Sequence, residues 1–150
     1  MREKRILLVE DDENDMLLTL RSLKDSNIVN PIDVVRDGVE ALDYLLGRGQ
    51  YSDHQERDAP AVVLLDLKLP KLGGLEVLRH IRSEPRTKHL PVVILTSSSE
   101  EKDIINGYKL GANSYVRKPV EFEQFCSAVK QLGCYWVLLN QAPPIEGNCL

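Results

Sequence analysis

The sequence predicts an α/β fold in which a five-stranded parallel sheet carries helices on both faces. Five short apolar segments recur along the 150 residues, and a longer segment with helical spacing of apolar residues follows each of them. Repetition of a strand and then a helix is typical of a parallel sheet. Right-handed crossovers then place the helices on both sides of that sheet.

The predicted strands lie at residues 6–9, 32–35, 61–65, 91–95 and 114–116. The segment 61–65 is apolar at every position, which is typical of a central strand covered on both faces. Asp12 is placed to cap the helix that follows the first strand. Gly47 and Gly111 are expected to end the second and fourth helices.

The remaining segments complete one domain and a tail. Residues 47–60 are polar and rich in turn formers, so we expect a surface loop there. A long final helix is predicted from about Glu121, which gives a domain over residues 1–139. Residues 140–150 contain Pro and Gly and are expected to form a C-terminal tail.

Composition argues against several classes of protein. The net charge is −4 and no long Lys or Arg run occurs, so direct nucleic-acid binding is not expected. No apolar stretch is long enough to span a membrane, and the first residues lack a signal-peptide layout. The three cysteines have no C-x-x-C spacing, which favours free thiols in a reducing compartment and a cytoplasmic location.

Polar side chains stand at the carboxyl ends of four predicted strands. Glu10 and Asp11 follow the first strand, and Asp66 follows the third. Thr96 and Lys118 follow the fourth and fifth strands. Because this edge is where open α/β sheets bind ligands, we expect these groups to form one site.

These residue types together indicate a metal-dependent phosphate site. Clustered carboxylates repel one another unless a cation neutralises them, and Mg²⁺ prefers oxygen ligands. Lys118 and Thr96 are suited to phosphate oxygens, and Asp66 could act as a nucleophile toward phosphorus. Taken singly, Asp12 is best explained as a helix cap, and a lone Thr or Lys at a strand end is usually solvated.

Four motifs together resemble the receiver domain of response regulators in two-component systems. They are V-E-D-D at 9–12, L-L-D-L-K-L-P at 64–70, T-S at 96–97 and G-A-N-S-Y-V-R-K-P at 111–119. The resemblance covers about residues 4–139. It implies a flavodoxin-like (βα)5 fold with the strand order 2-1-3-4-5.

The resemblance also implies a magnesium site. Asp66 would be the phosphoacceptor and also a ligand of the metal. Asp11 would bind Mg²⁺ directly, Glu10 would act through water, and the backbone carbonyl of Lys68 would be a further ligand. Some members carry Asp where this sequence has Glu10, and this variant leaves the expected metal site intact.

Carried over in the same way, Thr96 and Lys118 would contact the phosphoryl group. Tyr115 matches the aromatic switch residue, which turns inward when Thr96 moves toward that group. The implied role is phosphorelay signalling through an aspartyl phosphate, and not an enzyme activity. The upstream partner would be a histidine kinase.

The C-terminal segment indicates a partner surface. Residues 134–139 are apolar at every position, more than one helix can bury against its own domain. We therefore expect a homodimer whose interface includes Tyr135, Trp136, Leu138 and Leu139. This ending and the 47–60 loop resemble the small regulators associated with bacterial phytochromes, which implies a phytochrome-type kinase.

Two other functions fit the sequence less well. A Mg²⁺-dependent phosphatase of the haloacid-dehalogenase kind would need a D-x-D pair after the first strand and a capping insertion. The chain has Glu10-Asp11-Asp12 there and no room for the insertion. An unphosphorylated adaptor with the same fold is the other alternative, and the presence of Asp66, Thr96 and Lys118 argues against it.

Overall fold

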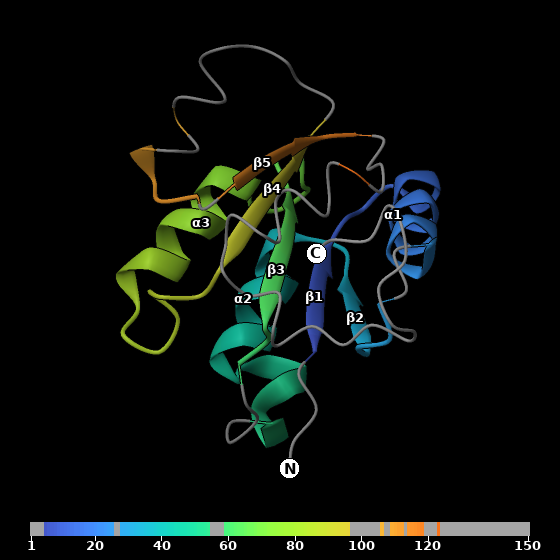
Figure 1. Ribbon diagram of the computed structural model, residues 1–150. Coiled ribbons are helices and arrows are strands. Elements are labelled where there is room, and N and C mark those ends of the chain that lie inside the picture. The colour runs from blue at the N-terminus through green and yellow to red at the C-terminus, as the bar shows by residue number, and fades with distance from the viewer. Residues whose placement is uncertain are drawn as a thin grey trace.

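The computed structural model describes residues 5–25, 28–54, 59–96, 106, 109–112, 114–118 and 123. Its strands are β1 (Ile6–Val9), β2 (Ile32–Val35), β3 (Val62–Asp66), β4 (Val92–Thr96) and β5 (Ser114–Arg117). Its helices are α1 (Glu13–Asp25), α2 (Gly38–Leu46), η1 (Gly49–His54) and α3 (Gly74–Ser83). The strands pair in parallel in the order β2-β1-β3-β4-β5, which confirms the predicted fold class and strand order (Figure 1).

Alternation along the strands sends side chains to two separate cores. Ile6, Leu8 and Leu64 pack on the side that α1 covers. Leu7 and Leu65 pack on the other side, against α2 and α3. Figure 1 shows this arrangement, with α1 lying apart from α2 and α3. The central strands are covered on both faces, which explains why β3 is apolar until its last residue.

Three strands differ slightly from their predicted bounds, and β5 ends one residue later, at Arg117. β3 and β4 begin and end one residue later, so Asp66 and Thr96 are the last residues of their strands. Asp66 ends β3 at the carboxyl edge of the sheet, where the apolar run of the strand stops. The predicted helices after β4 and after Glu121 fall largely outside the described residues, as does the 139/140 boundary.

The loop expected over 47–60 contains a short 3-10 helix, η1. Tyr51 anchors it, because its hydroxyl donates a hydrogen bond of 2.9 Å to Glu40 Oε2 on α2. The Tyr51 ring also meets the Tyr44 ring edge to face, with 5.2 Å between centroids. These contacts hold η1 against α2. The many turn-forming residues in this segment predict a loop but not this attachment.

Caps place the helices relative to the strand ends. Asp12 Oδ1 accepts a 2.9 Å hydrogen bond from the backbone N–H of Asp15, which confirms Asp12 as the cap of α1. Asp37 caps α2 through the backbone N–H of Glu40 at 2.7 Å. Gly47 ends α2 in the left-handed conformation, with φ 67°. The first turn of α1 is thereby held beside the carboxyl end of β1.

The start of α3 packs directly on the backbone of Asp66. A Cβ atom at Gly74 would lie 2.2 Å from the Asp66 carbonyl oxygen and 2.7 Å from Leu67 Cα. Only glycine allows this approach, so Gly74 determines how closely α3 sits against the end of β3. In the described part of the chain, no helix has the length and apolar character needed to cross a membrane.

Candidate functional site: an acidic cluster with one lysine

Three carboxylates meet at the carboxyl edge of the sheet. Glu10 and Asp11 follow β1, and Asp66 ends the neighbouring strand β3, where Val9 is paired with Leu65. One oxygen from each carboxylate lies within 4.8 Å of the others. Glu10 and Asp66 are buried, whereas Asp11 is exposed. We call Glu10, Asp11 and Asp66 the acidic trio.

Lys118 follows β5 and supplies a positive charge beside this trio. Its Nζ lies 2.8 Å from Glu10 Oε1 and 3.4 Å from Asp66 Oδ1. The lysine side chain is 8% exposed, so water screens these ion pairs weakly. The structure therefore brings together Glu10, Asp11, Asp66 and Lys118, as the strand-end pattern predicts.

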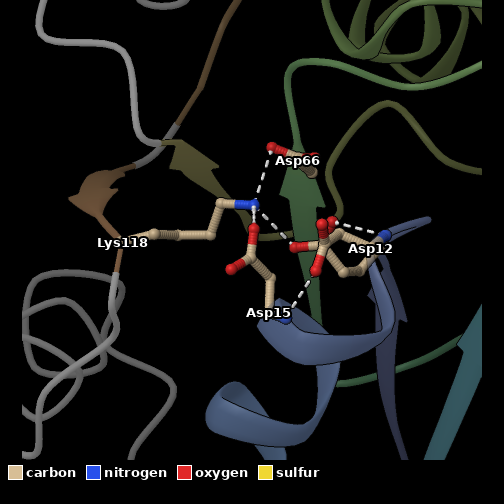
Figure 2. Close-up of polar contacts among 5 residues, drawn as sticks. Asp12, Asp15, Asp66 and Lys118 are labelled. Atoms are coloured by element: carbon tan, nitrogen blue, oxygen red, sulfur yellow. Dashed lines mark hydrogen bonds and ion pairs between the residues drawn. The ribbon is translucent and has the colours of Figure 1, made fainter.

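Asp15 also belongs to this cluster, although the strand-end pattern does not predict it. Asp15 Oδ2 lies 2.8 Å from Lys118 Nζ (Figure 2). An acidic residue in the first turn of a helix is ordinarily explained by the helix dipole, so its residue type carries no special signal. Its position in the first turn after β1 is the one clue, because that turn lies at the same edge as the strand ends.

Burial raises the pKa of Glu10 to about 7, since the carboxylate is removed from water and lies beside the charge of Asp66. The hydrogen bond from Lys118 offsets part of this effect. The pKa of Asp66 is likewise raised by burial, although Lys118 and the backbone N–H of Lys68 stabilise its charged form. Hydrogen bonds from Lys118 to Asp15 and Glu10 outweigh burial and raise the pKa of the ammonium group.

The donor set of the acidic trio fits a hard divalent cation. Carboxylate oxygens are the preferred ligands of Mg²⁺, whose ligands at about 2.1 Å lie roughly 3–4 Å from one another. The 4.8 Å span of the trio needs only a small contraction to reach that geometry. Lys118 cannot balance the trio and Asp15 together, so the cluster carries an excess of negative charge that a cation would offset.

Several predicted site residues are only partly described. The backbone places Thr96 at the end of β4, paired with Arg117, and Tyr115 within β5 opposite Ile94. The side chains of Thr96 and Tyr115 lie outside the described part of the chain. So do all of Tyr135, Trp136, Leu138 and Leu139, the predicted interface.

Comparison with known protein families agrees with this geometry. The model of the response regulator receiver domain matches residues 6–130. The chain belongs to the response regulator receiver family. The receiver assignment accounts for the sheet order and for the acidic residues at the ends of β1 and β3.

Relatives of this receiver domain include phytochrome response regulators. The bacteriophytochrome response regulator AtBRR has a structure that is 50% identical, with a TM-score of 0.84 over 94% of this chain and 100% of that one. Response regulator Rcp1 from Synechocystis sp. is 38% identical over 134 residues, 89% of each protein. These similarities confirm the expected likeness to phytochrome-associated regulators.

Two structures of related response regulators are of a metal-bound form and of a phosphorylated form. An Mn²⁺-bound form of Rcp1 is 37% identical, with a TM-score of 0.72 over 94% of this chain and 99% of that one. The phosphorylated cyanobacterial phytochrome response regulator RcpA is 39% identical, with a TM-score of 0.74 over 91% of this chain and 95% of that one.

Proposed function

We propose that this receiver domain takes a phosphoryl group from a kinase histidine onto Asp66, in a reaction that requires Mg²⁺. The observation that carries the proposal is the position of Asp66. It ends the central strand, its side chain is 5% exposed, and it lies between two further carboxylates and Lys118. A buried nucleophilic carboxylate with both an ammonium group and a cation site beside it suits phosphoryl transfer.

The proposed transfer exchanges one bond to phosphorus for another. An Asp66 oxygen forms a P–O bond while the N–P bond of the kinase phosphohistidine breaks, and the imidazole leaves with its electron pair and takes up a proton. Lys118 donates a hydrogen bond to a phosphoryl oxygen, and the Thr96 hydroxyl donates to another. Tyr115 acts as the switch residue and turns inward when Thr96 moves toward the phosphoryl group.

Mg²⁺ would be held by Asp11 and Asp66, with Glu10 acting through water and the Lys68 carbonyl as a further ligand. When bound, it would neutralise the charge of the phosphoryl oxygens. The raised pKa values of Glu10 and Asp66 support this assignment, because burial disfavours both charged carboxylates and a bound cation would stabilise them. The Mn²⁺-bound structure of the related regulator Rcp1 also supports a metal site in this chain.

The proposed output is a modified surface and not a released product. The phosphoryl group stays on the chain, so we class the protein as a signalling phosphoacceptor and not as an enzyme. We propose a phytochrome-type histidine kinase as the upstream partner, on the strength of the likeness to AtBRR, Rcp1 and RcpA.

The test is incubation with Mg²⁺ and acetyl phosphate, followed by intact mass measurement. We expect a gain of about 80 Da, the mass of one phosphoryl group. Asp66→Asn should abolish the gain, and removal of Mg²⁺ with EDTA should do the same. Asp43→Asn is the matched control, since Asp43 is a carboxylate on α2 that pairs with Arg48 and should leave the gain unchanged. No gain in the wild type would favour the adaptor alternative.

We also propose that the apolar segment 134–139 joins two copies of the chain. The sequence supports this, because an uninterrupted apolar run with Tyr135 and Trp136 has the composition of an interface core. Sedimentation of the wild type and of Trp136→Glu should separate a dimer from a monomer. An unchanged sedimentation coefficient would contradict the proposal.

A further inference from the structure

Lys118 donates its two short hydrogen bonds away from Asp66. Asp15 Oδ2 and Glu10 Oε1 both lie 2.8 Å from Lys118 Nζ, whereas Asp66 Oδ1 lies 3.4 Å away. Figure 2 shows the lysine side chain reaching toward Asp15 on one side and Asp66 on the other. An ammonium group has three N–H donors, so two of them are already committed.

Asp15 is held in place by the cap of its own helix. Its backbone N–H donates to Asp12 Oδ1 at 2.9 Å, which fixes the first turn of α1 beside the strand ends. Glu13 lies in the same turn and is also acidic, yet its side chain is exposed and is not among the partners of Lys118. The contact with Lys118 is therefore specific to Asp15 and does not follow from the acidity of the turn.

A phosphoryl group on Asp66 needs a donor from the same ammonium group. Glu10 is fully buried, so separating it from Lys118 would leave a carboxylate without water. Asp15 is 36% exposed, so water can solvate its carboxylate when Lys118 leaves it. Asp15 is thus the partner that Lys118 can give up at the lower cost in desolvation.

We propose that Asp15 is a positioning residue that restrains Lys118 on the α1 side and competes with the phosphoryl group for its ammonium. This inference rests on the proposed role of Asp66. Asp15 would thus influence both how readily Asp66 is phosphorylated and how long the phosphoryl group stays on it. Removing the Asp15 charge should favour the phosphorylated state, because Lys118 can then turn to the phosphoryl oxygens without breaking an ion pair to Asp15.

The experiment uses beryllium trifluoride with Mg²⁺ as a phosphoryl mimic that bonds to a carboxylate oxygen. Fluorine NMR titration gives the apparent affinity of the full chain for this probe. A partly exposed ion pair shifts such an equilibrium by about threefold to tenfold, so Asp15→Asn should bind the probe tighter by that factor. Asp15→Ser is a second uncharged variant that gives the same test should asparagine disturb folding.

Two variants separate competition for Lys118 from a change in helix charge. Glu13→Gln removes the same charge from the same turn and should leave the affinity at the wild-type value. Asp15→Glu keeps a carboxylate within reach of Lys118 and should restore the wild-type affinity, which a merely structural role for Asp15 would not require. An affinity of Asp15→Asn equal to that of Glu13→Gln, or weaker than wild type, would overturn the inference.

The wild type and Asp66→Asn distinguish a failure of the proposed function from a failure of the role assigned to Asp15. If the wild type gives no bound fluorine signal, or Asp66→Asn gives the same signal as the wild type, the proposed function fails and the inference falls with it. If the signal depends on Asp66 and is indifferent to Asp15, the proposed function stands and the role of Asp15 alone is wrong.

Discussion

The ammonium group of Lys118 and the carboxylate of Glu10 form a buried ion pair that joins two strands of the sheet. Their atoms are 2.8 Å apart, Glu10 is 0% exposed and Lys118 is 8% exposed. Glu10 follows β1 and Lys118 follows β5, so the pair spans β3 and β4, the strands between them. Lys118, the residue that follows β5, therefore supplies a positive charge to the buried carboxylates of the cluster.

Replacing Lys118 with methionine should destabilise the fold in the absence of divalent metal. The substitution keeps most of the side-chain volume and leaves buried carboxylates without their counter-charge. Breaking such a pair costs about 3 kcal/mol in free energy of unfolding. Urea unfolding measures it, and Lys88→Met, at an exposed lysine, should change stability by less than about 0.5 kcal/mol. Equal stabilities for the two variants would contradict this prediction.

Mg²⁺ should stabilise the folded chain, because the proposed site in the acidic trio would exist only when β1 and β3 are paired. A concentration tenfold above the dissociation constant adds about 1.4 kcal/mol to the free energy of unfolding. Thermal unfolding with Mg²⁺ and with EDTA measures the difference. Asp11→Asn should remove most of the stabilisation, whereas Asp12→Asn, which retains a capping side chain, should keep it. A gain that survives Asp11→Asn would place the metal elsewhere.

Gly74→Ala should destabilise the protein and slow modification of Asp66. The new methyl group would meet backbone atoms of Asp66 and Leu67, which cannot rotate away. Overpacking of this kind costs about 2 kcal/mol. The matched control is Gly73→Ala, since the nearest atom to a Cβ there is 4.0 Å away. Urea unfolding and the acetyl phosphate reaction should both separate the two variants, and identical behaviour would refute the prediction.

The Tyr51 to Glu40 hydrogen bond should give stability that is lost in alkali. Burial and the neighbouring Glu40 raise the pKa of Tyr51 from 10.0 to about 12. Below pH 10 the hydroxyl is neutral in both states and the contribution is complete. Between pH 10 and pH 12 the unfolded chain ionises first, so the contribution falls and is gone above the folded pKa.

Urea unfolding of the wild type and of Tyr51→Phe across this range isolates the effect from other titrating groups. The wild type should be more stable by about 1 kcal/mol below pH 10, the contribution of one hydrogen bond. That advantage should shrink steadily as the pH approaches 12. An advantage that stays constant with pH would show that Tyr51 ionises normally.

Local patterns predicted most of the fold and the residues of the acidic trio. A fully apolar run such as 62–65 that ends in Asp66 indicates both a central strand and the place where it reaches the sheet edge. Contacts between distant residues away from the strand ends were not predictable in this way. Arg82 donates hydrogen bonds to the carbonyl oxygens of Gly111 and Leu90, and no sequence pattern predicts these contacts.

The sequence by itself determined the parallel α/β architecture, the caps at Asp12 and Gly47, and which strand ends carry charge. Such features depend on periodicity and on residues close together in the chain, so the amino-acid order specifies them directly. Only the tertiary structure decided that Lys118 is shared among Asp15, Glu10 and Asp66. The physical reason is that an ammonium group pairs with whichever carboxylates the folded backbone brings within hydrogen-bonding distance, and that distance depends on packing between elements far apart in sequence.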